Sequence, residues 1–270
     1  MKKVVVLIPV YKSILGVDEE VSFRQTLTIL GKHVISLVCP ESLDVEAYGS
    51  IANECEIKLE IQRFSNVFFN GIAGYNKLLL SEIFYSRFKN YDYMLICQLD
   101  AFVFKDDLLE WCAKGYDYIG APLFGDYFDV NQGIVGNGGF CLRRVEAFRA
   151  FFEGRKNVYK TGDILNHLSS KKKPFLRKIL RILMLLGLRN KPKSVANHWR
   201  ENEDLFWSIK LDGTNYALQK PSVLEALHFS FERFPSEAYH LISCLPFGCH
   251  AWKKYHYDEF WSKFIHEQEY

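Results

Sequence analysis

Apolar residues follow alternating patterns along the first hundred residues of the chain. Short continuous apolar runs, typical of strands buried on both faces, are separated by stretches in which apolar residues recur with helical spacing. The runs predict strands at residues 3–9, 33–38, 56–61 and 93–99, and the stretches between them predict helices at 19–30, 42–52 and 74–88. Strands that alternate with helices predict an α/β fold with a mostly parallel sheet and right-handed crossovers.

After Asp100 the patterns become shorter and less regular. Helices are predicted at 106–114, 145–152, 203–210 and 222–227, strands at 116–119, 139–142 and 216–218, and an ordered loop at 126–138. Neither an internal repeat nor a low-complexity linker interrupts the chain. We therefore expect a single domain over residues 1–270, with an inserted basic helical segment at 170–194.

The inserted segment differs from the rest of the chain in charge. Residues 164–200 contain ten basic residues and no acidic one, although the net charge of the whole chain is only +2. On a helix, Arg177, Lys178 and Arg181 would cluster on one side of an otherwise apolar surface. Residues 171–193 are therefore a candidate for binding an anionic membrane surface, and the alternative is a helix packed on the domain with a solvated basic edge. Because the basic residues are confined to this one segment, we do not expect general nucleic-acid binding.

Composition is typical of a globular protein from a reducing compartment. Apolar residues make up 49% and charged residues 24% of the 270 residues, which is enough for a substantial core. The odd number of cysteines, seven, predicts buried free thiols. The amino-terminal apolar run is too short for a signal peptide, and no stretch reaches the roughly 20 apolar residues that span a bilayer. We expect a cytoplasmic protein, peripheral on the cytoplasmic membrane face if the basic segment binds lipid.

Asp100 is the first candidate for chemistry. It follows the strand predicted at 93–99, so it would lie at the carboxyl edge of the sheet, where open α/β folds bind their ligands. A carboxylate at that position can hold Mg²⁺ or Mn²⁺ against a diphosphate. The alternative is an Asp that only caps the turn that follows.

Further along the chain, three blocks carry glycine, acidic and imidazole groups. The glycine-rich stretch at 136–139 permits close approach of a ligand to the backbone, or is only a turn. Glu203 and Asp204 open a predicted helix, either as a carboxylate base aimed at a cleft or as acids that favour the helix dipole. His250 stands between Gly and Trp residues in an irregular segment, where it could close a metal or diphosphate site, although a single His is usually structural.

In this order the blocks resemble the shared core of GT-A glycosyltransferases: a nucleotide loop after the first strand, a D-x-D-like motif, a glycine-rich loop, an acidic x-E-D motif and a C-terminal His. The chain is more closely similar to an uncharacterised glycosyltransferase-like family with Q-x-D-A-F-V-F, Y-D-Y-I-G-A-P, G-N-G-G-F, N-E-D-x-F-W and F-G-C-H-A-W blocks. These blocks stand here at 98–104, 116–122, 136–140, 202–207 and 247–252. The resemblance implies a GT-A-type, Rossmann-like mixed sheet flanked by helices.

The resemblance also implies roles for individual residues. The donor would be bound by Pro9, Val10 and Tyr11 at the nucleotide base and by Asn76, Lys77, Gln98 and Asp100 along the ribose and diphosphate. The metal, Mn²⁺ or Mg²⁺, would be held by Asp100 and His250. The acceptor side would be formed by Gly136, Asn137, Gly138, Gly139 and Trp207. Asp204 would be the catalytic base, with Glu203 as the less favoured candidate.

The function expected from these roles is transfer of a sugar from a nucleoside diphosphate sugar to a hydroxyl group. The acceptor would be a glycan or lipid-linked molecule in bacterial-type surface polysaccharide assembly, and a single base predicts inversion at the anomeric carbon. Gln98 stands where a D-x-D motif has its first Asp, so metal affinity is lowered or metal is not needed. One alternative is a non-catalytic, degenerate sugar- or membrane-binding module. The other is a metal-dependent phosphoesterase or nucleotidyltransferase, for which dense Asp and His clusters are lacking.

Overall fold

The computed structural model describes residues 2–162, 164, 179, 182–183 and 189–265. Most of the basic segment at 170–194 lies outside the described residues, and so do Arg177, Lys178 and Arg181 with the membrane-binding role predicted for them. Within the described residues, no helix combines the length and the hydropathy that crossing a membrane requires.

The centre of the molecule is a mixed sheet of six strands in the order β3-β2-β1-β4-β9-β6. Four neighbouring strands run parallel, and these are β3 (Leu59–Phe64), β2 (Val34–Pro40), β1 (Val4–Pro9) and β4 (Tyr93–Cys97). The other two, β9 (Phe140–Arg144) and β6 (Tyr118–Gly120), are each antiparallel to their neighbour. The four parallel strands agree with the mostly parallel sheet that the pattern predicts, and the sheet as a whole is mixed, as the resemblance implies. The two antiparallel strands lie together at one side of the sheet.

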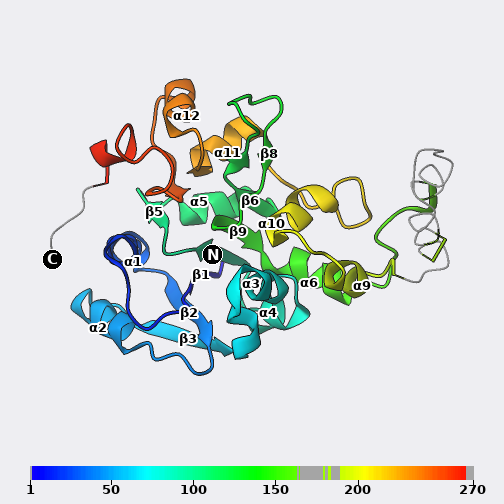
Figure 1. The fold of residues 1–270 in the computed structure, drawn as a ribbon, viewed down its shortest axis with the longest axis horizontal. Helices are drawn as coiled ribbons and strands as arrows, with labels where there is room; N and C mark the ends of the chain where they lie inside the picture. Colours follow the sequence, from blue (N-terminus) through cyan, green and yellow to red (C-terminus); the bar gives the residue numbers. More distant parts are fainter. Residues whose placement is uncertain (1, 163, 165–178, 180–181, 184–188, 266–270) are drawn as a thin grey trace.

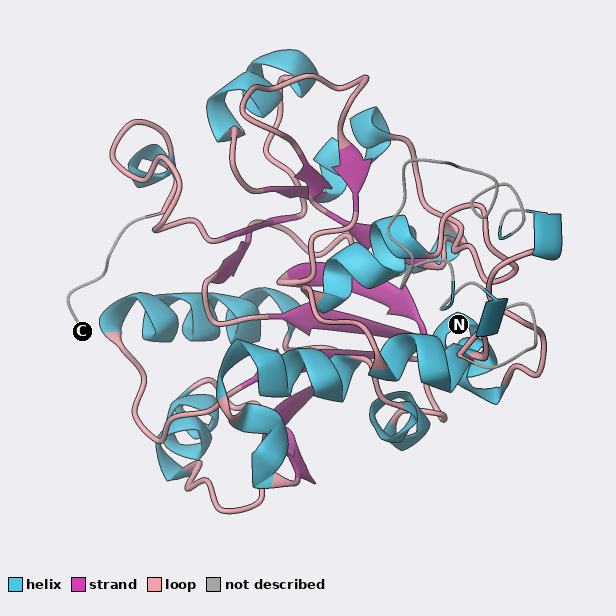
Figure 2. Cartoon of the chain, turned by 45° about the vertical axis from the view of Figure 1, so that its right-hand side comes forward, coloured by secondary structure: helices cyan, strands magenta, loops and turns pink. Residues whose placement is uncertain are grey.

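Helices cover both faces of the sheet (Figure 2). One face packs against α1 (Val17–Leu30), α2 (Glu46–Glu54) and α5 (Leu108–Ala113), and the other against α3 (Gly71–Leu79), α4 (Glu82–Arg87) and α6 (Val145–Glu153). Side chains alternate along β1, so that Val4, Val6 and Ile8 join the first core while Val5 and Leu7 join the second. Burial on both faces is why this strand reads as a continuous apolar run.

A smaller sheet lies beside the carboxyl end of β4. Its strands are β10 (Ser230–Phe231), β11 (Gly248–His250) and β5 (Ala101–Val103), in that order. A two-stranded ribbon of β7 (Pro122–Leu123) and β8 (Ile134–Val135) adds to this part of the molecule. Helices α11 (Val223–Phe229) and α12 (Pro235–Ile242) lie on the same side (Figure 1). A third core, rich in aromatic rings, includes Phe102, Trp252 and Trp261.

The remaining described elements are short. They are the 3₁₀ turns η1 (Asn66–Phe69) and η3 (Trp261–Lys263), the helices α9 (Pro192–Asn197) and α10 (Glu203–Leu205), and the π-helical turn η2 (Phe206–Lys210). A π-helical turn inside a helix is rare and is frequently found at functional sites. It directly follows the residues predicted to supply the base.

Four predicted elements differ in kind from the structure. The helix predicted at 203–210 is α10 followed by the π-helical turn η2, and the loop predicted at 126–138 contains β8. The helix predicted at 74–88 is broken, because Ser81 caps a new helix by accepting a hydrogen bond from the Phe84 amide at 3.4 Å. The strand predicted at 216–218 is not formed. Instead, Gln219 is tied to Asp117, whose amide donates to the Gln219 carbonyl at 2.8 Å and whose carboxylate accepts from the Gln219 amide at 2.9 Å.

Candidate active site

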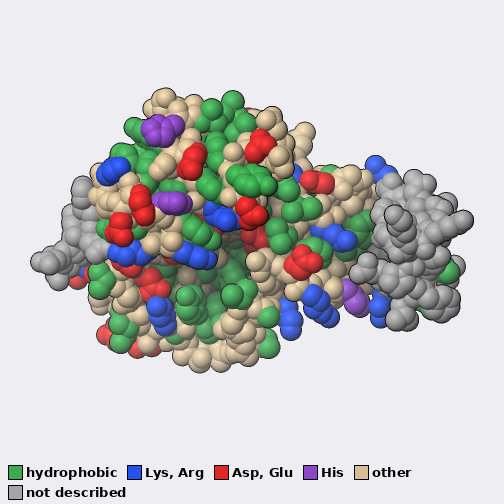
Figure 3. Space-filling model, turned by 45° about the horizontal axis from the view of Figure 1, so that its top comes forward, with side chains coloured by type: hydrophobic (Ala, Val, Ile, Leu, Met, Phe, Trp, Pro, Cys, Tyr) green, Lys and Arg blue, Asp and Glu red, His purple; other side chains and the backbone are tan. Residues whose placement is uncertain are grey.

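A cavity of about 580 Å³ opens at the carboxyl edge of the parallel strands. Its walls come from the ends of β1 and β4, from α1, α3 and α10, and from the glycine-rich loop before β9. They are formed by Pro9, Tyr11, Glu19, Phe69, Gly71, Ile72, Tyr75, Asn76, Gln98, Leu99, Asp100, Gly138, Gly139, Asn202, Glu203 and Asp204. The space-filling view shows a hollow near the middle of the molecule, with hydrophobic, acidic and basic side chains around it (Figure 3). Open α/β sheets bind ligands at this edge.

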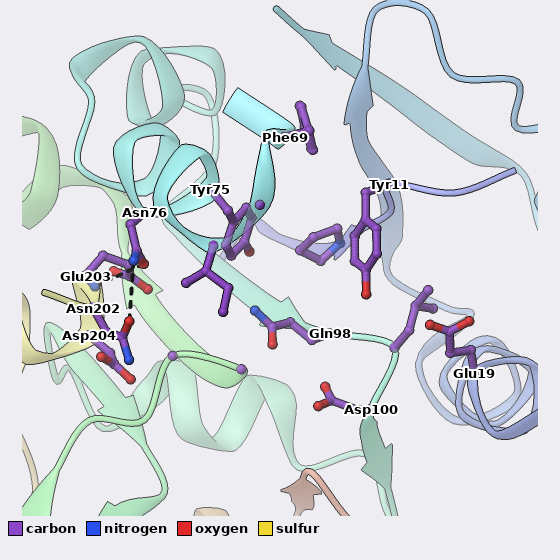
Figure 4. Close-up of a pocket in the computed structure, with 16 residues that line it drawn as sticks. Tyr11, Glu19, Phe69, Tyr75, Asn76, Gln98, Asp100, Asn202, Glu203 and Asp204 are labelled. Carbon is purple, nitrogen blue, oxygen red and sulfur yellow. Dashed lines mark hydrogen bonds between the residues drawn. The ribbon is translucent and has the colours of Figure 1, made fainter. Parts of the chain in front are cut away.

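The ends of β1 and β4 lie side by side because these strands are parallel neighbours. Pro9 is the last residue of β1, and Tyr11 beyond it is exposed at the cavity wall. Val10 lies between them but does not line the cavity, because its side chain is fully buried in the core. Gln98 and Asp100 follow the end of β4 and enter the cavity next to this wall (Figure 4).

The small sheet brings His250 to Asp100. In the antiparallel register of β11 and β5, His250 pairs with Ala101, the residue after Asp100. The Nε2 atom of His250 lies 3.3 Å from Asp100 Oδ1 and 3.3 Å from Gln98 Oε1. Its Nδ1 atom lies 3.0 Å from Glu232 Oε1, so the imidazole ring is held between two carboxylates. Glu232 was not a predicted site residue, and its place after the two-residue strand β10 gives no sequence signal.

The two carboxylates set the charge of this cluster. Burial lowers the pKa of His250, but hydrogen bonds to Asp100 and Glu232 outweigh burial and raise it to about 10. Burial also raises the pKa of Asp100, yet the hydrogen bond to His250 leaves it below its usual value. Lys254, on the turn after β11, lowers it further through its charge. Lys77, predicted to contact the donor, is exposed and does not line the cavity.

A divalent cation bound between Asp100 and His250 would have to displace the Nε2 proton of the imidazole, which forms the hydrogen bond to Asp100. Two ligand atoms about 2.1 Å from one ion and at right angles stand about 3.0 Å apart, close to the 3.3 Å between Oδ1 and Nε2. The bond from Nδ1 to Glu232 is the kind of outer contact that orients a metal-binding His. No group of three or more His, Cys, Asp and Glu side chains in the described residues is placed to hold a metal. A third ligand would therefore be an amide oxygen, and that of Gln98 is in reach.

The glycine-rich loop is shaped by the side chains around it. A Cβ atom on Gly139 would lie 2.0 Å from His250 Nε2, and a Cβ atom on Gly138 would lie 2.8 Å from Glu203 Oε1. Asn137 fixes the loop, because its Oδ1 accepts from the Gly139 amide at 2.9 Å and its Nδ2 donates to Glu232 at 3.0 Å. Of the residues in this loop, only Gly138 and Gly139 line the cavity. Their lack of a side chain makes room for the imidazole of His250 and the carboxylate of Glu203.

Three of the five residues predicted for the acceptor side do not line the cavity, and these are Asn137, whose bonds fix the loop, and Gly136 and Trp207. Gly136, with φ of 140°, is buried, and a Cβ atom there would lie 2.5 Å from Ser208 Cβ. Trp207 is fully buried among aromatic rings, with Phe148 at 4.7 Å and Phe206 at 5.0 Å between ring centroids. Neither Gly136 nor Trp207 lines the cavity, so the structure does not show the acceptor contacts predicted for these two residues.

Glu203 and Asp204 are neighbours in the chain with different surroundings. Glu203 is 4% exposed and accepts a hydrogen bond from Arg143 Nη2 at 2.8 Å, and Arg143 also donates to the Tyr85 hydroxyl at 2.8 Å. Burial raises the pKa of Glu203 to about 7, against the opposing charge of Arg143. Asp204 is half-buried at the cavity wall, and its Oδ1 accepts from the Leu205 amide at 2.7 Å. Burial also raises the pKa of Asp204.

Helix α3 meets the start of α10 through amide side chains. Asn76 Oδ1 accepts from the Glu203 amide at 3.2 Å, and Asn76 Nδ2 donates to Asn202 Oδ1 at 3.4 Å (Figure 4). Asn202 and the ring of Tyr75 complete this end of the cavity, whereas Phe69 and Glu19 belong to other parts of the wall. None of these four was predicted. Asn202 is the first residue of the N-E-D-x-F-W block, and that block is the signal that could have found it, whereas Tyr75 only adjoins the predicted Asn76.

A family profile matches residues 58–250, which is more than half of the chain. The chain belongs to the family described as Protein of unknown function (DUF5672). The matched residues of this DUF5672 protein include all of the site except the end of β1 and the start of α1. No curated protein sequence matches the chain.

Solved structures with a similar fold include glycosyltransferases, and a cytidylyltransferase also matches with a TM-score of 0.35. Mouse xyloside xylosyltransferase 1 in its apo form is 13% identical, with 91% of this chain and 96% of that chain covered and a TM-score of 0.50. Core-mannan synthase A of Aspergillus fumigatus in its Mn/GDP form is 10% identical, with 76% and 71% covered and a TM-score of 0.44. The galactosyltransferase LgtC with donor and acceptor sugar analogues is 11% identical, with 91% and 86% covered and a TM-score of 0.46. The DUF5672 protein has a GT-A-type fold, as predicted.

Proposed function

We propose that this protein is a glycosyltransferase that moves a sugar from a nucleoside diphosphate sugar to a hydroxyl acceptor. The observation that carries the proposal is one cavity at the ligand-binding edge of a GT-A-type sheet, in which the carboxylates of Asp100 and Asp204 lie apart and have different partners. Asp100 is paired with His250, which suits a diphosphate and its cation, while Asp204 lies at the other side of the cavity near Asn202 (Figure 4).

Asp204 is the proposed base. In the transfer step, the bond between the anomeric carbon and the diphosphate oxygen breaks and a bond from that carbon to the acceptor oxygen forms. The acceptor proton passes to an Asp204 carboxylate oxygen, and the diphosphate leaves with the electron pair. A carboxylate whose pKa is raised by burial accepts a proton more readily. Attack from the face opposite the leaving group inverts the configuration. Glu203 is held by Arg143 and instead fixes the start of α10.

Asp100 and His250, with the amide oxygen of Gln98, would hold Mn²⁺ or Mg²⁺ in this proposal. A bound cation would neutralise charge on the diphosphate. Glu232 holds the imidazole in position, and the charge of Lys254 acts on the same side of the cavity. Tyr11 and Pro9 form the wall against which the nucleotide base would pack.

The acceptor and the cellular setting extend the same proposal. A glycan or lipid-linked acceptor in surface polysaccharide assembly would be met on the cytoplasmic face of a membrane. The support for this is the basic composition of residues 164–200, which matches an anionic lipid surface. Binding of the full-length protein to phosphatidylserine vesicles, compared with neutral vesicles, tests this part separately.

The first experiment is a thermal shift with UDP, GDP, CDP and CMP, each with and without Mn²⁺, on the native protein and Asp100→Ala. A ligand at 100 times its Kd stabilises the folded state by about 2.7 kcal/mol. We expect a Mn²⁺-dependent shift with one nucleotide that Asp100→Ala loses. Glu237→Gln, an exposed acid on α12, is the matched control and should keep the shift. No shift with any nucleotide would refute the donor site.

A non-catalytic sugar-binding module is the second candidate, and the amide of Gln98 in place of a carboxylate favours it. The two candidates differ at Asp204. An enzyme with Asp204→Asn should bind the nucleotide as before and lose transfer by at least a hundredfold, since general-base catalysis contributes about 10²–10⁴-fold. Full transfer by Asp204→Asn would refute Asp204 as the base. Nucleotide binding with no hydrolysis or transfer by the native protein would favour the module.

A further inference from the structure

The cavity changes character along its length. Tyr11 and Glu19 stand at one end, Gln98 and Asp100 lie near the middle, and the amides of Asn76 and Asn202 gather with two carboxylates at the other end (Figure 4). Aromatic and apolar groups pack on a nucleotide base, whereas amide and carboxylate groups form hydrogen bonds with hydroxyl groups. If the proposed function holds, the nucleotide base therefore lies toward Tyr11 and the donor sugar toward Asn76 and Asn202.

The charges on the wall are unevenly compensated. Of the residues that line the cavity in the described part of the chain, four are acidic and none is Lys or Arg. Glu19 is paired with Lys12 at 2.8 Å, and Glu203 with Arg143 at 2.8 Å. Asp100 is paired with His250 at 3.3 Å. Asp204 differs from these three carboxylates, because no described Lys, Arg or His lies within ion-pair distance of it.

Asp204 therefore gives the sugar end of the cavity a negative charge. The side chain is half-buried, so solvent screens it less than it would screen a surface carboxylate. Arg143 does not offer a second contact there, because it is fully buried behind Glu203 and bonded to the Tyr85 hydroxyl. A carboxylate on the sugar ring would meet Asp204 with no cation in ion-pair contact, because the buried Arg143 acts on Asp204 only through its charge from behind Glu203.

We infer that the donor sugar carries no carboxylate: the site takes a neutral, hydroxyl-rich sugar and rejects uronates. This inference rests on the proposed function and adds the class of sugar. Asn76 and Asn202 supply both donors and acceptors to neutral hydroxyl groups, and Asp204 accepts from them. Two like charges held close together without an ion-pair partner are a repulsive element of the kind that gives an enzyme discrimination between substrates.

The test compares two donors that differ only at carbon 6. The Kd of UDP-glucose and of UDP-glucuronate is measured by calorimetry with Mn²⁺ on the native protein, with GDP-mannose and GDP-mannuronate as the pair if GDP is the nucleotide that binds. We expect the neutral sugar nucleotide to bind at least tenfold more tightly than the uronate. Equal or tighter binding of the uronate, with the nucleotide alone still bound, would overturn the inference and leave the proposed function standing. Failure of the nucleotide alone to bind would instead refute the proposed function.

Two further measurements assign the discrimination to Asp204. In Asp204→Asn the ratio of the two Kd values should fall below threefold, while Glu19→Gln, which removes a carboxylate at the far end of the cavity, should leave the ratio unchanged. For the native protein, raising NaCl from about 50 mM to about 500 mM should also shrink the ratio, because salt screens repulsion between charges. A ratio that responds neither to Asp204→Asn nor to salt would show that shape, and not charge, excludes the uronate.

Discussion

Replacing Arg143 with Met removes the positive partner of a fully buried ion pair. Arg143 is 0% exposed, donates to Glu203 and to the Tyr85 hydroxyl at 2.8 Å each, and lies over the rings of Tyr118 and Phe148. Removing one member of a buried pair usually costs about 3–5 kcal/mol, because the other charge is left without a partner. Glu203 can take up a proton in the variant, which limits the loss, so we expect about 3 kcal/mol.

The assay is urea unfolding at pH 8 together with a thermal melt. For a chain of this size about 3 kcal/mol corresponds to a fall in Tm of roughly 6–12 °C. The double variant Arg143→Met with Glu203→Leu replaces the pair by apolar groups and should recover most of the loss. Arg149→Met is the control, since Arg149 forms an exposed pair with Glu153 that is worth at most about 0.5 kcal/mol. A loss below about 1 kcal/mol for Arg143→Met, or a double variant less stable than the single, would refute the role of the buried pair.

Three more predictions concern single side chains. Gly139→Ala places a Cβ atom 2.0 Å from His250 Nε2, so it should weaken Mn²⁺-dependent nucleotide binding at least tenfold in a thermal-shift titration, whereas Gly125→Ala, which meets nothing within 4 Å, should not. Because burial raises the pKa of Glu203 from 4.5 to about 7, the folded state binds this proton more tightly and stability falls as pH rises through that interval, by up to about 3 kcal/mol. Glu203→Gln should flatten urea-derived stability between pH 4.5 and pH 7, and an unchanged slope would contradict the shift. Trp207→Ala should cost about 3–5 kcal/mol in urea unfolding, because the ring is fully buried, and a loss under about 1 kcal/mol would argue against that burial.

The parallel half of the fold could be predicted from the sequence because its strands are buried on both faces. A continuous apolar run such as β1 needs no tertiary information, since each of its residues packs into one of two cores. The strands β5, β10 and β11 contain two or three residues each, which is too few to show any period. They are defined by what they pair with, and such pairing is not visible in a single sequence.

In the candidate site, too, some residues could be predicted from the local sequence and others depend on tertiary contacts. The place of Asp100 followed from the end of a buried strand. His250 was a candidate from its irregular segment, and the resemblance paired it with Asp100. Glu232 had no signal, because it contacts the site through the imidazole that it holds. Trp207 was assigned to the acceptor side through the resemblance, as the last residue of the N-E-D-x-F-W block. The π-helical turn carries that ring into the aromatic core, while Asp204 stays at the cavity wall. Two residues that are close in the sequence can therefore have side chains that point to different parts of the molecule.

The pairing of β5 with β11 has a consequence for how the protein folds during its synthesis. His250 reaches Gln98, a partner 152 residues earlier in the chain, only when these strands pair. Contacts so far apart form late in folding, because a long loop must close first. During synthesis the carboxyl edge of β1 and β4 emerges early, yet it lacks its imidazole until residue 250 has left the ribosome. In the proposed function, a nascent chain would therefore carry an incomplete diphosphate site, and donor binding would begin only after residue 250 has been made.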